Sequence, residues 1–196
     1  MRVLHEHYGG VTVPSETVER DGRVLVDSKH GRLSQLLAYG ILTEQESEGL
    51  FKFCGVRNPF DSLVSLYEKT RCRYVRQLDN PDHFIHRSPR QLRAARATRD
   101  GFPSWLQAMF GDDIHKPPAH LEGALNDDLD FVIRFEHLQA DFDEVMARLG
   151  LETHPVPEVN LTPGRTDDYR SYYDQASRGL VERRFALDLD KFGYVF

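Results

Sequence analysis

The chain has little of several features that define whole classes of protein. Its 196 residues include two cysteines, Cys54 and Cys72, which are too few for a disulfide framework, and Cys54 lies in an apolar stretch typical of a buried thiol. No apolar run approaches the roughly 20 residues that cross a bilayer. The opening MRVLHEHYGG lacks the apolar centre of a signal peptide. We therefore expect no membrane span and a reducing compartment, most simply the cytoplasm.

Lysine is also scarce, because arginine outnumbers it twenty to five. The net charge of −6 argues against general nucleic-acid binding. Between residues 71 and 99, however, eight arginines accompany only two aspartates, a local excess of six that leaves −12 for the remainder. This asymmetry predicts an anion-facing surface on an acidic body, and the alternative is a solvated arginine-rich helix.

The patterns that are present predict one α/β domain over residues 1–196. Hydrophobic residues make up 40% of the chain, which is ordinary for a globular protein. Short apolar stretches alternate with helical patterns, and this order favours a mainly parallel sheet flanked by helices. The expected strands are 24–27, 50–56 and 131–134, and the expected helices are 33–39, 59–74, a segment from 88, 102–110, 135–149 and parts of 167–190, with a loop at 75–87.

The most informative stretch is FKFCGVRNPFDSLVSLYEKTR, residues 51–71. Arg57 follows an apolar strand, and Asn58 and Pro59 suit the cap and first position of the next helix. Ligands of open α/β sheets bind beyond the carboxyl ends of strands, and a helix start favours an anion. Arg57 and the Ser65 hydroxyl therefore predict a phosphate site. In the alternative, Arg57 pairs with a local carboxylate and Ser65 bonds a carbonyl of its own helix.

Within this stretch, VRNPFDSLVSLY resembles the motif by which sulfotransferases hold the 3′-phosphate of PAPS (3′-phosphoadenosine-5′-phosphosulfate). In that family a strand leads into R-[DN]-P and a helix that carries serine eight residues after the arginine. Three further stretches are similar to the carbohydrate, or heparan-type, branch and keep its order. They are KHGRLSQL at 29–36, DFVIRFEHLQADFDEVMARLGL at 130–151, and Asn160 with the later DDYRSYYD and DLDKFGYVF.

The resemblance implies a P-loop-NTPase-like sulfotransferase fold and transfer of a sulfuryl group from PAPS to a carbohydrate hydroxyl, without a metal. His30 precedes Arg57 by 27 residues, comparable to the catalytic histidine of heparan-type enzymes, so it is the expected base. Lys29 is expected to help neutralise charge. The resemblance assigns to the PAPS donor Arg57, Ser65, Thr162, Arg165 and Tyr169.

One departure concerns the start of the chain. Family members open with a strand and a loop like PK-T-G-[GST]-[ST], which holds the 5′-phosphosulfate, and no such loop precedes residue 29. VLVDSKHGRLS contains K-x-G-x-x-S and can be read as a degenerate phosphate loop, although the resemblance favours the family's later lysine-histidine element. We therefore expect the first strand and loop to be missing. The alternative function is a truncated or non-catalytic relative that binds nucleotide or anionic polymer without transfer.

Other residues give weaker indications. The arginines at 87, 90, 93, 96 and 99 are candidates to face an anionic acceptor, and Tyr67 and Trp105 are either sugar-stacking or core aromatics. Glu136 is expected to be a structural acid. The histidine pairs His5/His7 and His83/His86 lack a third ligand, so no metal site is expected. The acceptor and the oligomeric state are not specified by any pattern.

Overall fold

The computed structural model describes residues 2–113, 115–158, 165 and 168–196 of the chain. The chain divides into two compact units. Unit 1 holds Met1–Val56 and Glu122–Val159, and unit 2 holds Arg57–Leu121 and Asn160–Phe196. Among the described helices, none has both the length and the apolar composition needed to cross a membrane.

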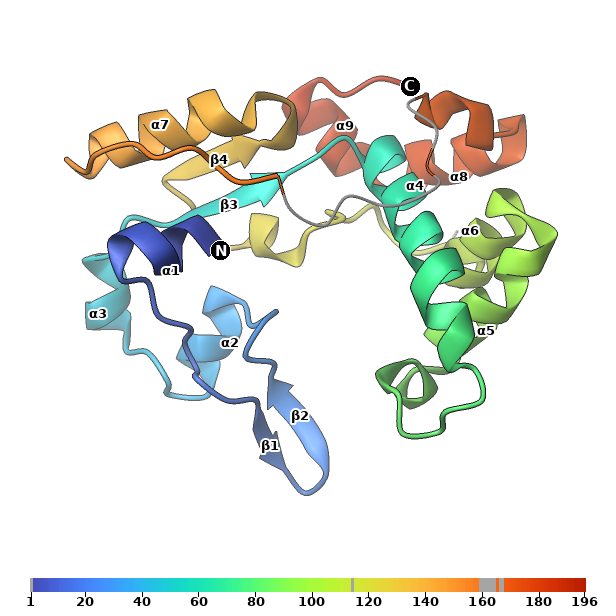
Figure 1. Cartoon of the computed structure of the whole chain (residues 1–196), viewed down its shortest axis with the longest axis horizontal. Helices are drawn as coiled ribbons and strands as arrows, with labels where there is room; N and C mark the ends of the chain where they lie inside the picture. The colour runs from blue at the N-terminus through green and yellow to red at the C-terminus, as the bar shows by residue number, and fades with distance from the viewer. Residues whose placement is uncertain (1, 114, 159–164, 166–167) are drawn as a thin grey trace. The chain divides into compact units, whose positions relative to one another are not determined.

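Unit 1 is built on a parallel strand pair. Strand β3 (Phe53–Val56) pairs with β4 (Phe131–Arg134) in parallel, the pairing expected for an α/β fold. Helix α7 (Leu138–Arg148) lies against this pair in Figure 1, and α1 (Arg2–Tyr8) contributes to the same core. The buried residues of this core are Val3, Ile133, Phe142, Val145 and Met146.

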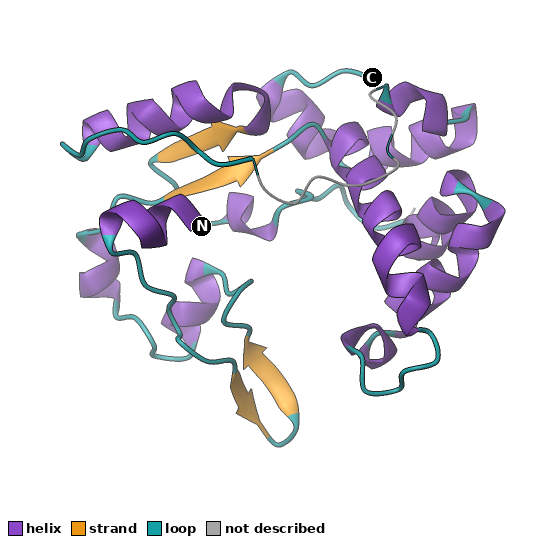
Figure 2. Ribbon diagram, in the orientation of Figure 1, coloured by secondary structure: helices purple, strands orange, loops and turns teal. Residues whose placement is uncertain are grey.

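A separate hairpin and two short helices complete unit 1 (Figure 2). Strands β1 (Val18–Arg20) and β2 (Arg23–Val26) are antiparallel. Asp21 and Gly22 join them with φ of 51° and 72°, and positive φ at both central positions is what a tight two-residue hairpin turn requires. The short helices are α2 (Leu33–Ala38) and α3 (Glu44–Glu48).

Unit 2 is helical and has its own core. Helices α5 (Pro89–Ala97) and α6 (Phe102–Phe110) lie side by side in Figure 1, and α4 (Pro59–Lys69) and α8 (Gln175–Arg184) both contact α6. Helix α9 (Ala186–Phe192) follows α8. The buried residues of this core are Phe60, Leu63, Val64, Tyr67, Ala94, Phe102, Trp105, Leu106, Leu180, Val181 and Phe185.

The α/β class predicted from the sequence is confirmed in coarse form, but the described residues are mostly helical. Their sheets are two strand pairs, one antiparallel and one parallel, so an extended parallel sheet is not seen in this part of the chain. The helix expected over 59–74 remains α-helical to Lys69 and then widens into a π-turn, Thr70–Tyr74. The Thr70 hydroxyl donates to the Leu66 carbonyl at 2.7 Å, a local bond of the kind that disturbs helices.

Candidate functional site

The start of α4 has the local structure that its sequence predicts. Asn58 is the N-cap, its side-chain oxygen accepts a hydrogen bond from the Phe60 amide at 3.1 Å, and Pro59 holds the first helical position. Arg57 immediately precedes the cap and is 22% exposed. The chain therefore leads directly from strand β3 through Arg57 into a capped helix.

Positions 57, 61 and 65 are spaced by four residues and bring three polar side chains together at this helix start. Arg57 forms a hydrogen bond and an ion pair with Asp61. Arg165, far along the chain, also pairs with Asp61 and donates to the Ser65 hydroxyl oxygen. We call Arg57, Asp61, Ser65 and Arg165 the arginine cluster, and it unites three of the residues assigned to the donor from the sequence.

The arginine cluster bears on both sequence hypotheses. The ion pair between Arg57 and a local carboxylate, proposed as the alternative, is present. The Ser65 hydroxyl oxygen accepts a hydrogen bond from Arg165, whereas the alternative had the hydroxyl donating to a carbonyl of its own helix. Within these four residues, two guanidinium groups share one carboxylate at a helix N-terminus, where anions are favoured. Such a group of forked donors suits an oxyanion that brings more charge than Asp61 alone.

Tyr169 lies near the same helix start. Its hydroxyl is 3.5 Å from the Asn58 side-chain nitrogen, which also donates to the Val195 carbonyl at 3.1 Å. Its ring contacts Phe196 edge to face at 6.1 Å. Thr162, also assigned to the donor from the sequence, lies outside the described residues.

Lys29 and His30 belong to unit 1 and have exposed side chains. Their backbone amides both donate to the Asp27 carboxylate, at 2.8 and 3.0 Å. A phosphate loop presents such amides to its ligand, whereas here a side chain occupies them, so the contact does not favour the degenerate phosphate loop. Strand β2 before this loop is antiparallel to β1, which is also unlike the parallel strand of a strand–loop–helix phosphate site.

Three arginines of the row on and around α5, namely Arg90, Arg93 and Arg99, form ion pairs within the protein, and the expectation for Arg87 and Arg96 stays a prediction. Arg90 makes two hydrogen bonds of 2.8 Å to Asp113, and Arg93 donates to Asp112 at 2.6 Å and to the Ala108 carbonyl. The carboxylates of the turn after α6 thus pair with both guanidinium groups, Arg90 and Arg93. Arg99 lies 3.5 Å from Asp100 in an exposed pair.

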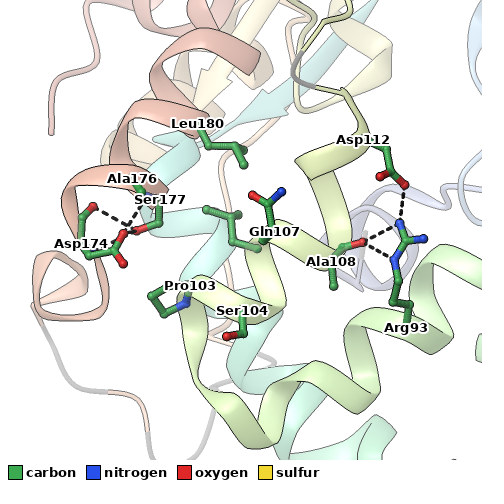
Figure 3. Close-up of a pocket in the computed structure, with 11 residues that line it drawn as sticks. Arg93, Pro103, Ser104, Gln107, Ala108, Asp112, Asp174, Ala176, Ser177 and Leu180 are labelled. Atoms are coloured by element: carbon green, nitrogen blue, oxygen red, sulfur yellow. Dashed lines mark hydrogen bonds and ion pairs between the residues drawn. The ribbon is translucent and has the colours of Figure 1, made fainter.

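Arg93 also borders a cavity of about 650 Å³ in unit 2. Figure 3 shows its guanidinium fixed by Ala108 and Asp112 on one side of the cavity, while Asp174 caps α8 through Ser177 on the other. Hydrogen bonds from the Ser177 hydroxyl and amide lower the pKa of Asp174. Among the described residues, the charges that line this cavity are one cation and two carboxylates, so they do not favour an anion.

The structure also bears on the aromatic residues, on Glu136 and on the possible metal ligands named from the sequence. Trp105 is 1% exposed and Tyr67 is 6% exposed, so both are core residues and not sugar-stacking platforms. Glu136 is exposed in a 3₁₀ turn before α7. Within the described ranges, His, Cys, Asp and Glu residues form no group of three able to hold a metal ion.

Sequence reasoning missed the partners that organise these sites. It did not recognise that the oxygens of Asp61 join Arg57 to Arg165, although the spacing of four residues from Arg57 was a visible signal. It also missed the pairing of His120 with the fully buried Asp188, residues 68 apart, for which no local pattern gives a signal.

Comparison with known proteins identifies the family. A model described as "Sulfotransferase family" matches residues 11–195, which is almost the whole chain. The chain therefore belongs to the sulfotransferase family, a family of PAPS-dependent enzymes that implies a P-loop-like fold. No curated protein and no solved structure matches the chain.

Proposed function

We propose that this protein transfers the sulfuryl group of PAPS to a hydroxyl of a carbohydrate acceptor, as a member of the carbohydrate branch of the family. The observation that carries the proposal is the convergence of Arg57 and Arg165 on the Asp61 carboxylate at the start of α4, with Ser65 hydrogen-bonded to Arg165. Arg57, Arg165 and Ser65 are the residues for which the sequence resemblance implies contact with the donor nucleotide. They also supply the charge and hydrogen-bond donors that a phosphate needs.

In this proposal the 3′-phosphate takes over part of the bonding that Asp61 provides. A phosphate brings up to two negative charges and three acceptor oxygens, so it competes with a single carboxylate for the N–H groups of Arg57 and Arg165. The Ser65 hydroxyl, which accepts from Arg165 in the structure, then donates to a phosphate oxygen. Thr162 and Tyr169 are proposed to close over the nucleotide.

The chemical step joins the acceptor oxygen to sulfur and breaks the bond between sulfur and the bridging phosphate oxygen. The products are the sulfate ester and 3′-phosphoadenosine-5′-phosphate (PAP). His30 is the proposed base that removes the acceptor hydroxyl proton, and Lys29 the cation that stabilises charge on the departing phosphate. Their exposed side chains, on a loop ordered by Asp27, support this assignment.

A transfer assay tests the proposed function. The protein is incubated with PAPS carrying a labelled sulfuryl group and a panel of glycans, and label in the glycan is counted. We expect transfer by the wild type and a fall of about 100-fold or more in His30→Ala, because general-base catalysis contributes on that order. PAP binding should be unchanged in this variant, since His30 has no proposed role in holding the 3′-phosphate.

The alternative is a relative that binds the nucleotide without transfer. PAP binding by the wild type without labelled product on any glycan would establish the alternative and contradict the proposed reaction. The cytoplasmic location stays a prediction based on the scarcity of cysteine in the sequence.

A further inference from the structure

A second cavity in unit 2 gathers charged groups that the proposed donor site does not use. It has a volume of about 450 Å³ and is bordered by α8, the start of α9 and the segment after α6. Phe110, Pro118 and Leu180 provide apolar wall, and charged side chains provide much of the rest. Leu180 also borders the larger cavity of Figure 3, so the two cavities are neighbours.

One buried carboxylate in this cavity collects three cations. Asp113 is 3% exposed and accepts two hydrogen bonds from Arg90. Lys116 lies 2.7 Å and Arg184 3.9 Å from its oxygens. Burial raises the pKa of Asp113, but the hydrogen bonds and charges of Lys116 and Arg90 outweigh burial and lower it. The carboxylate is therefore ionised at neutral pH and outnumbered by its partners.

The other charged side chains that line the cavity add to the positive charge around Asp113. Glu182, the other carboxylate in the lining, is paired with Arg178 at 2.7 Å, and Arg183 forms no ion pair in the part of the chain that the structure describes. Among the described residues, the lining carries three cations and two carboxylates, an excess of one positive charge. The ion-pair partners Arg90 and Arg178, which do not line the cavity, raise the group to five cations and two carboxylates. The whole chain carries −6, so this concentration is not a reflection of average composition.

The hydrogen bonding of Arg184 is also incomplete. One terminal nitrogen donates to the Pro117 carbonyl at 2.8 Å. Its Nε atom is buried and has no hydrogen-bond partner among the described residues. This Nε atom lies 3.9 Å from Asp113 Oδ2, which is within ion-pair distance but too long for a hydrogen bond. Because buried donors are normally satisfied, the guanidinium retains unused hydrogen-bonding capacity.

We propose that this cavity binds an oxyanion, a sulfate ester or a carboxylate, carried on a sugar ring of the acceptor. Lys116, Arg183 and Arg184 attract the anionic group, and the apolar wall at Phe110 and Leu180 covers the ring. That the ligand is part of the acceptor saccharide rests on the proposed function. The preference for an anion follows from the charged residues that line the cavity. The larger cavity lacks this preference because Asp112 neutralises Arg93 there.

Calorimetric titration of the full chain with a uronate-containing disaccharide bearing one sulfate ester tests the proposal. Its desulfated and carboxyl-reduced forms are titrated in parallel to distinguish the two anionic groups. We expect removal of one of the groups to weaken wild-type binding about tenfold, as expected for a lost charge-assisted hydrogen bond. Arg183→Gln should remove most of that preference, and Arg183→Gln with Lys116→Gln should remove it completely. Arg20→Gln, an exposed change of the same charge in strand β1 of unit 1, should bind like the wild type.

Any of three results would overturn the proposal. The wild type binds all three disaccharides equally, the cavity variants bind them like the wild type, or the wild type does not bind them. PAP titration separates this outcome from failure of the proposed function. Arg183→Gln should bind PAP normally, and Arg57→Ala should bind the disaccharide normally. Absence of PAP binding by the wild type would contradict the donor assignment and leave the disaccharide result to decide the cavity.

Discussion

At the residue scale, Asp61 is the group that decides how the arginine cluster works. It pairs with Arg57 and with Arg165, and all three side chains are between 16% and 22% exposed. A carboxylate in this position both organises the guanidinium groups and competes with any phosphate for them. Organising the guanidinium groups raises the stability of the fold, whereas competing with phosphate lowers the affinity for the ligand. Substitution of Asp61 separates the two effects.

We expect Asp61→Asn to lower the free energy of unfolding by about 1–3 kcal/mol, because two partly buried guanidinium groups lose a charged partner. The same change should raise PAP affinity about 3- to 10-fold, because a competing charge is removed from beside the phosphate. Urea unfolding and calorimetry measure the two quantities. Glu144→Gln, which removes an exposed pair with Arg148, should change stability by less than about 0.5 kcal/mol and leave PAP binding unchanged. A loss of both stability and PAP affinity in Asp61→Asn would show that Asp61 positions the arginines without competing.

Asp113 gives a prediction for pH dependence. Its pKa is lowered in the folded state, so the unfolded chain binds its proton more readily. The stability that Asp113 contributes is therefore present above about pH 4, the ordinary range of an aspartate, and is lost as pH falls through the lower folded-state pKa. Asp113→Asn should be less stable at neutral pH and should lose less stability on acidification than the wild type. Unfolding curves from pH 6 to pH 2 test this, with Asp112→Asn as the exposed control, and parallel acid limbs for Asp113→Asn and wild type would contradict it.

At the element scale, the start of α4 is held by Asn58 in two ways. Its oxygen caps the helix, and its nitrogen donates to the Val195 carbonyl. Asn58→Ala loses both contacts and should cost about 1–2 kcal/mol, whereas Asn58→Asp keeps the cap and should cost less. Thermal unfolding of the two variants provides the comparison. Equal destabilisation would mean that the cap contributes little.

Element boundaries show what the sequence determines locally. The helix at Phe102–Phe110 and the strand at Phe131–Arg134 were predicted with their observed bounds. The cap and first-turn residues also placed the start of α4 correctly. The short α1 and α3 and strand β1 were missed, because brief elements give few periods of hydrophobic alternation.

The candidate site was predictable to a smaller extent. Arg57 and Ser65 follow from one motif, so the sequence brings them onto one short segment. Arg165 was assigned to the nucleotide from the resemblance, but its contact with Ser65, 100 residues away, depends on tertiary packing. The pairing of Arg90 and Arg93 with the acidic turn after α6 likewise could not be read from spacing, which only showed that the arginines spread around a helix.

At the scale of the whole molecule, positive charge is concentrated within an acidic chain. Unit 2 contains both the arginine cluster and the cavity bordered by Lys116, Arg183 and Arg184. A module that binds acidic polymers through such charges alone would weaken steeply with salt and would be indifferent to Arg57. A nucleotide site predicts a shallower salt dependence and a strong requirement for Arg57.

Calorimetric titration of the wild type, Arg57→Ala and Arg96→Ala with PAP tests the central claim most directly. We predict that Arg57→Ala binds PAP at least about 30-fold more weakly, because a forked charge-assisted contact is lost, while circular dichroism remains native. Arg96→Ala, a matched change of charge on the exposed side of α5, should bind within about twofold of the wild type. Equal PAP affinity in Arg57→Ala and the wild type would contradict the assignment of the arginine cluster to the donor phosphate.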